Sequence, residues 1–71
     1  MTGDELRAWR ERWLIASQGE LARLLGVHIN TVHSWERGTR AIPHFLPLAL
    51  ETLARQRAAE LLERAHGPVS V

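Results

Sequence analysis

Two small residues at fixed spacing, Ala22 and Gly26, constrain the fold of this chain more than any other feature. Two helices that cross steeply over a short turn come closest near a position such as Ala22, where a larger side chain would force them apart. The turn needs a backbone with positive φ at Gly26, which glycine adopts without steric cost. Apolar residues that would hold such a pair onto a core follow at helical spacing: Leu21, Leu25, Val27, Val32 and Trp35. The pattern predicts two short helices joined by a tight turn over about residues 18–37.

Helix start signals place one more helix before this pair. Thr2 and Glu5 match a capping box, in which a hydroxyl and a carboxylate each bind a backbone N–H group of the first turn. Apolar residues then recur on one face, so this helix is expected to run to about Leu14. Ser17 and Glu20 match a second capping box, which predicts where the paired helices begin.

A longer helix is expected at the end of the chain, over about residues 44–65. Pro43 and Pro47 frame its start, because proline is tolerated in a first turn, where backbone N–H groups are unpaired. Its apolar side consists of Phe45, Leu46, Ala49, Leu50 and Leu53. A Gly-Pro pair ends it, and residues 67–71 are expected to form a flexible tail. These signals predict an all-α single domain over residues 1–66, with four to five helices and an extended C-terminal helix.

Composition excludes several classes of protein. The 71 residues contain no cysteine, which excludes disulfides and thiolate metal sites. No apolar run reaches the roughly 18 residues of a membrane span, and the N-terminus does not resemble a signal peptide, so a cytoplasmic protein without a membrane partner is expected. All nine basic residues are arginine, which suits phosphate and guanine. A GC-rich genome would give the same bias, and a net charge of +1 does not by itself indicate a polyanionic partner.

Catalytic and metal chemistry find little support in the sequence. His28 and His33 lie more than one helical turn apart, and no suitably spaced carboxylate completes a metal site. Ser17, Ser34 and Ser70 have no paired base in view, and the chain has no glycine-rich phosphate loop. We therefore expect no enzyme activity, no cofactor and no bound metal.

Over residues 6–53 the chain resembles the Cro/C1-type (XRE-like) helix-turn-helix domains of phage repressors and bacterial regulators. The resemblance is carried by Ser17-Gln18-Gly19-Glu20-Leu21-Ala22, Leu25-Gly26-Val27, Thr31-Val32, Ser34-Trp35-Glu36-Arg37-Gly38 and Ile42-Pro43-His44-Phe45-Leu46-Pro47. It implies a lambda-repressor-like helical bundle that binds double-stranded DNA, with the second helix of the pair in the major groove.

Three features depart from the family pattern. The turn at residues 14–16 is one residue longer than the usual Gly-Leu pair. His28 replaces the Ser or Thr that usually caps the recognition helix, which predicts a less well fixed helix start. The long C-terminal helix lacks the break found in phage repressors, so their dimer interface does not transfer directly.

The resemblance implies that the outer face of the recognition helix contacts bases. The residues that avoid the face of Val32 and Trp35 include four candidate base contacts, Ile29, Asn30, His33 and Ser34. Asparagine binds adenine N6 and N7 together, histidine and serine offer one hydrogen bond each, and isoleucine packs on a thymine methyl group. The alternative is an ordinary solvated helix face.

Other residues are expected to bind the DNA backbone. Gln18 stands at a helix N-terminus, where backbone N–H groups favour an anion, and in the family this glutamine commonly holds a phosphate. Arg37, Thr39 and Arg40 flank the recognition helix, and His44 stands where related repressors often place a basic residue near the minor groove. For each of these residues, simple solvation is the alternative.

Arg10 and Glu36 are expected to play a structural part. In the family, an arginine late in the first helix often pairs with a glutamate just before the glycine that ends the recognition helix. If the additional residue lies after Trp13, Arg10 is that arginine. The pair would hold the recognition helix to the domain without contacting DNA.

The resulting prediction is a homodimeric repressor or autoregulator on a palindromic operator, of the phage-repressor, restriction-modification-controller or anti-CRISPR-operon type. At 1.5 Å per residue the C-terminal helix would be about 33 Å long, more than the other helices can cover. Arg55, Gln56 and Arg57 interrupt its apolar stripe, so a short contact through Leu61 and Leu62 is the expected dimer interface, unless the distal segment frays. The alternative function is a protein-interaction module, such as an antitoxin or adaptor that uses this helix.

Overall fold

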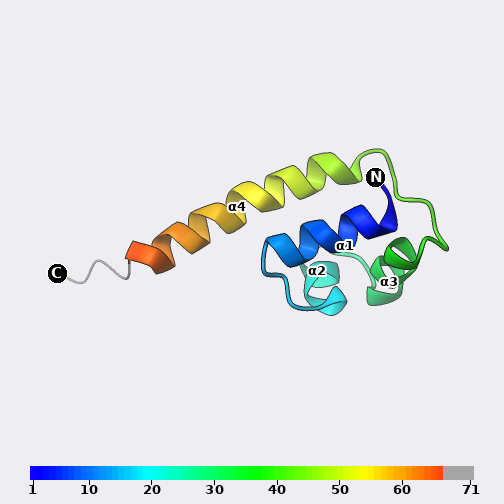
Figure 1. Cartoon of the computed structure of the whole chain (residues 1–71), viewed down its shortest axis with the longest axis horizontal. Coiled ribbons are helices and arrows are strands. Elements are labelled where there is room, and N and C mark those ends of the chain that lie inside the picture. The colour runs from blue at the N-terminus through cyan, green and yellow to red at the C-terminus, as the bar shows by residue number, and fades with distance from the viewer. Residues whose placement is uncertain (67–71) are drawn as a thin grey trace.

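The computed structural model describes residues 1–66, and within them the chain folds into helices joined by turns (Figure 1). The helices are α1 (Gly3–Arg12), α2 (Gln18–Leu25), α3 (Ile29–Arg37) and α4 (Leu46–His66). The fold is the expected all-α, lambda-repressor-like one. The tail predicted at residues 67–71 lies outside the described residues. In the described part of the chain, no helix combines the length and apolarity needed to cross a membrane.

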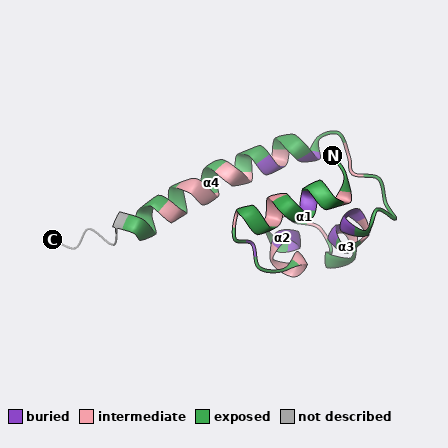
Figure 2. Cartoon of the chain, in the orientation of Figure 1, coloured by how far each residue is buried: buried purple, intermediate pink, exposed green. Residues whose placement is uncertain are grey.

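Helices α1, α2 and α3 pack around one small core, which the first turns of α4 close. Figure 2 shows buried residues on the sides of these helices that face one another. The core consists of Leu6, Ile15, Leu21, Ala22, Val32, Trp35, Leu46 and Leu50. Every helix contributes to it, so the orientation of α3 is fixed by packing against the rest of the domain.

The tight turn between α2 and α3 has the predicted geometry. Ala22 is 3% exposed, and Gly26 has φ 73°, in the left-handed region. The N–H of Gly26 donates to the carbonyls of Ala22 and Arg23, and the N–H of Val27 donates to Ala22 at 3.0 Å. These bonds satisfy two of the last four carbonyls of α2 and turn the chain directly into α3.

The helix caps follow the sequence signals with one correction. Thr2 and Glu5 form the complete capping box at the start of α1, with bonds of 2.8 and 3.1 Å. At the start of α2 the Ser17 hydroxyl accepts from the N–H of Glu20, but the Glu20 carboxylate binds the N–H of Ala16 instead of Ser17. The second capping box is therefore only half formed.

His28 caps α3 with its ring. Its Nδ1 accepts a hydrogen bond from the N–H of Asn30 at 3.1 Å, in the way a serine or threonine oxygen would. The expected weakness at this helix start is therefore wrong, because the imidazole supplies the missing acceptor.

The α1–α2 turn differs from the expectation that α1 reaches Leu14. Helix α1 ends at Arg12, and Leu14 has φ 60°, which is unusual for a residue with a side chain. This left-handed residue lets the chain reverse and places Ile15, 2% exposed, in the core. The carbonyls of Trp13 and Leu14 accept hydrogen bonds from Arg57 of α4 at 3.1 and 3.0 Å.

Helix α4 begins two residues later than predicted, at Leu46, with Pro47 in its first turn as expected. His44 and Phe45 form a turn in which Pro43 accepts from the N–H of Leu46, and Phe45 is 65% exposed instead of lying on the apolar side. The prediction that Arg57 interrupts the apolar stripe of α4 is wrong in one respect. Arg57 lies on the same face as Leu53 and donates hydrogen bonds to the α1–α2 turn. Beyond this contact α4 projects past the other helices (Figure 1).

Candidate nucleic-acid interface

Helix α3 presents a polar face that the core holds in place. Val32, Trp35 and Glu36 are buried on its inner side. Of the four candidate base contacts, Asn30 and His33 are exposed, Ile29 is 47% exposed and Ser34 is half-buried. The structure therefore places Ile29, Asn30 and His33 on an accessible surface. Ser34 is only partly accessible.

Gln18 connects the start of α2 to α3 through both ends of its side-chain amide. Its Nε2 donates to Glu36 at 3.0 Å, and its Oε1 lies 3.1 Å from Nδ1 of His33. One amide hydrogen is thus used inside the protein, and the other is the one that could reach a phosphate. A candidate phosphate contact and a candidate base contact are consequently joined by a direct hydrogen bond.

Glu36 is the centre of these contacts, and its side chain is fully buried. It accepts from Arg10 at 2.8 Å through Nε and 3.2 Å through Nη2, and Nε of Arg7 lies at 3.5 Å. Arg10 also donates to the carbonyl of Ile15 at 3.1 Å, so it fixes the α1–α2 turn as well. We call Arg7, Arg10, Gln18, His33 and Glu36 the Glu36 network.

The Glu36 network keeps this carboxylate ionised. Burial alone would raise the pKa of Glu36, but the hydrogen bonds from Arg10 and Gln18 and the charge of Arg10 outweigh it, and the pKa lies below its ordinary value. The same hydrogen bond to Glu36 raises the pKa of Arg10 above its ordinary value. The pair is therefore charged on both sides throughout the neutral range.

The candidate backbone contacts beyond Gln18 follow α3 closely. Arg37 is exposed at the last turn of α3, and His44 is exposed in the turn before α4. The hydroxyl of Thr39 donates to the carbonyl of Ser34 at 3.3 Å, which helps to close the end of α3. Arg40 reaches back to the helix and donates to the hydroxyl of Thr31 at 3.2 Å. The four side chains are accessible, and two of them also have partners within the protein.

Sequence reasoning missed several residues that position this surface. Arg7 stands one helical turn before Arg10, so helical spacing could have found it. Gly3 lies directly against α3, since a Cβ atom there would come within 2.5 Å of the carbonyl oxygens of Trp35 and Glu36. No pattern in the sequence indicates that approach. Arg57 could have been found, because it is in phase with the apolar stripe of α4.

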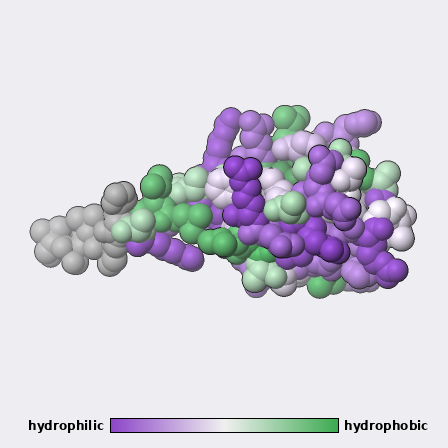
Figure 3. Space-filling view, viewed as in Figure 1, coloured by the Kyte–Doolittle hydropathy of each residue, from purple (hydrophilic) through white to green (hydrophobic). Residues whose placement is uncertain are grey.

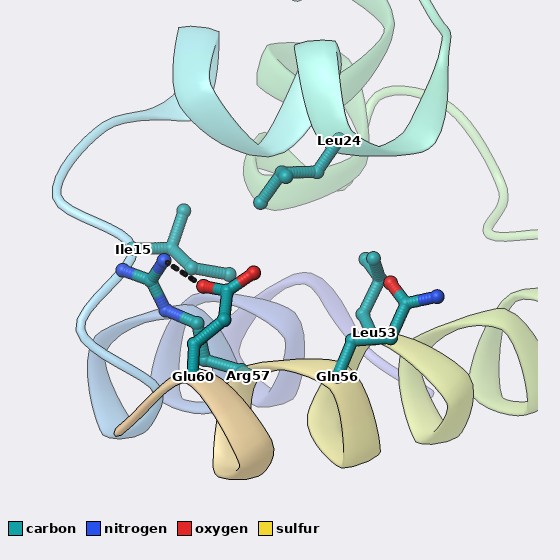
Figure 4. A pocket seen from close by; sticks show the side chains of 6 residues that line it. All are labelled: Ile15, Leu24, Leu53, Gln56, Arg57 and Glu60. Atoms are coloured by element: carbon teal, nitrogen blue, oxygen red, sulfur yellow. Dashed lines mark hydrogen bonds and ion pairs between the residues drawn. The ribbon is translucent and has the colours of Figure 1, made fainter. Parts of the chain in front are cut away.

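A shallow groove elsewhere on the molecule does not belong to this surface. It lies between α2 and α4 and is lined by Ile15, Leu24, Leu53, Gln56, Arg57 and Glu60 (Figure 4). Arg57 and Glu60 form an ion pair across its edge at 3.4 Å. Within residues 1–66, no three histidine or acidic side chains gather where they could hold a metal ion.

Comparison with known proteins agrees with this geometry. A family model described as helix-turn-helix, of the Cro/C1 type, matches residues 6–45, which is more than half of the chain. No curated protein matches the chain, and no solved structure matches it. The matched residues contain α2, α3, the turn between them and all five residues of the Glu36 network. The chain belongs to the Cro/C1-type (XRE-like) helix-turn-helix family of DNA-binding transcription regulators.

Proposed function

We propose that the protein is a homodimeric repressor that acts in the cytoplasm on a palindromic operator, and that it regulates its own gene. The observation that carries the proposal is the exposed face of α3, held rigidly by a buried core and the Glu36 network. Ile29, Asn30 and His33 would contact base edges, with Ser34 at the margin. Gln18, Arg37, Thr39, Arg40 and His44 would bind the phosphate backbone on either side.

Selection from a pool of random duplexes tests this function directly. The full chain should enrich a sequence of two inverted half-sites whose centres lie about 10 base pairs or a multiple of that apart. Enrichment of no sequence would contradict the proposal. It would favour the second candidate, a protein-interaction module that uses the projecting part of α4.

Arg40→Ala should weaken binding to all sequences to about the same extent. A phosphate contact contributes through counterion release, so its loss should reduce the slope of log K against log salt by about one unit. Titration of the selected duplex at several salt concentrations measures this slope. Arg55→Ala is the matched control, because Arg55 on α4 is 80% exposed and its ion pair within the described residues is with Glu51 of its own helix. An unchanged slope in Arg40→Ala would remove Arg40 from the backbone contacts.

The homodimer should depend on the projecting end of α4. Figure 3 shows apolar side chains on this part of the helix, and Leu62 is 60% exposed while Leu61 is half-buried. Apolar surface of this kind is stabilised when a second copy covers it. Two-fold pairing would set the distance between two recognition helices.

Leu62→Glu should convert the dimer to a monomer and weaken operator binding at least tenfold, since a glutamate would lie in the apolar contact. Analytical ultracentrifugation of the full chain measures the oligomeric state. Leu48→Glu is the matched control, because Leu48 is 67% exposed near the start of the same helix. If Leu48→Glu dissociates the dimer and Leu62→Glu does not, the interface lies at the start of α4 instead.

A further inference from the structure

We propose that His33 reads an exocyclic amino group, on cytosine N4 or adenine N6, through an Nε2 atom that the Glu36 network makes a hydrogen-bond acceptor. The inference rests on the proposed function, because it requires α3 to face base edges. It goes further by assigning the direction of one hydrogen bond, and with it the class of base that this position prefers.

Glu36 fixes the orientation of the Gln18 amide. Glu36 is an ionised carboxylate held by Arg10, so it can only accept hydrogen bonds. The amide of Gln18 must therefore present its NH₂ group to Glu36, at the observed 3.0 Å. The reversed amide would place two acceptor oxygens against each other beside a fully buried charge, which is strongly unfavourable.

The Gln18 amide in turn fixes the position of the proton on His33. With the NH₂ group of Gln18 on Glu36, the amide oxygen faces Nδ1 of His33 at 3.1 Å. An amide oxygen is only an acceptor, so Nδ1 must carry a proton and donate it. In a neutral imidazole only one nitrogen is protonated, and Nε2 is left with a lone pair.

An Nε2 atom with a lone pair binds hydrogen-bond donors in a major groove. Cytosine N4 and adenine N6 carry N–H donors there, whereas guanine O6 and N7 and thymine O4 are acceptors. His33 is exposed on α3, so its ring is accessible to one of these groups. A lone pair on Nε2 attracts the amino groups and repels the acceptors. His33 therefore distinguishes bases that present a hydrogen-bond donor from bases that present an acceptor.

The experiment has one readout without DNA and one with it, both at about pH 8.5, above the range in which histidine side chains usually change charge. In the free full-length protein, ¹⁵N NMR should show a protonated, pyrrole-type Nδ1 and an unprotonated, pyridine-type Nε2 for His33. Gln18→Ala should return the ring to a mixture of the two tautomers. His28, whose Nδ1 accepts a hydrogen bond from the backbone of Asn30, is the internal control and should show the opposite tautomer.

With the selected operator, His33→Ala should lose preference at one base pair, and the parent should prefer cytosine or adenine there. Replacing that base with one that presents an acceptor should weaken the parent about fivefold or more, the effect of one ordinary hydrogen bond, and leave His33→Ala unchanged. A proton on Nε2 in the free protein, a preference for guanine or thymine, or no change in preference in His33→Ala would each overturn the inference. The proposed function would survive these results, whereas enrichment of no sequence at all would contradict both.

Discussion

Arg10→Ala should lower the free energy of unfolding by about 3–5 kcal/mol, the cost of leaving one charge of a buried pair without its partner. The side chain of Glu36 is fully buried and that of Arg10 is 11% exposed, so solvent cannot replace the lost bonds. The variant also loses the hydrogen bond from Arg10 to the carbonyl of Ile15 in the α1–α2 turn. Because small domains have total stabilities of only about 5–15 kcal/mol, this is a large part of the whole. Urea denaturation followed by circular dichroism measures it.

Arg7→Ala is the matched control for this effect. Arg7 approaches the same carboxylate at 3.5 Å, but its side chain is 51% exposed. An exposed ion pair contributes at most about 1 kcal/mol, so this variant should remain close to the parent. If Arg10→Ala and Arg7→Ala unfold at the same urea concentration, the buried pair does not hold α3 as we infer.

The pH dependence of Arg10→Ala should identify Glu36 as the cause. In the parent the pKa of Glu36 is lowered in the folded state, so its contribution is present above the unfolded pKa and is lost as the pH falls through the folded value. Without Arg10, burial should dominate and raise the pKa of Glu36. The variant should then be stabilised, relative to the parent, as acid protonates this side chain. We expect the difference in unfolding free energy to shrink between about pH 7 and pH 4.

The sequence predicts those parts of the fold that depend on local backbone chemistry. Within the apolar pattern, Ala22 and Gly26 are the positions that distinguish the turn between α2 and α3, because their roles depend on the size of one side chain and the sign of one dihedral angle. The capping box at Thr2 and Glu5 is local in the same way.

Features that depend on long-range packing were predicted less well. The left-handed conformation of Leu14 is stabilised by Arg57, 43 residues away, and local patterns carry no information about such a contact. Phe45 matches an apolar stripe but precedes the helix and is exposed. At the candidate interface, the sequence supplies the identities of Gln18 and His33, whereas the hydrogen bond between them requires the fold.

Gly3→Ala should lower the free energy of unfolding by about 1–3 kcal/mol, which is the usual cost of an overpacked site. We expect a value near the upper end of this range. A Cβ atom at this position would lie 2.4 Å from the carbonyl oxygen of Glu36 and 2.5 Å from that of Trp35. Both are backbone atoms of α3, so no side-chain rotation can relieve the contact. Helix α1 must instead move away from α3, although alanine is the better helix former.

That movement should also weaken the Glu36 network, since Arg10 extends from α1 to α3. We therefore expect the losses of unfolding free energy in Gly3→Ala and Arg10→Ala to be less than additive when both substitutions are combined, because each removes part of the same contact. Gly19→Ala is the matched control in the first turn of α2. Its Cβ atom would meet the terminal methyl group of Ile29 at 3.3 Å, and a flexible side chain can move aside. If Gly3→Ala is as stable as Gly19→Ala, then α1 and α3 can separate without loss, and the close approach does not fix the recognition helix.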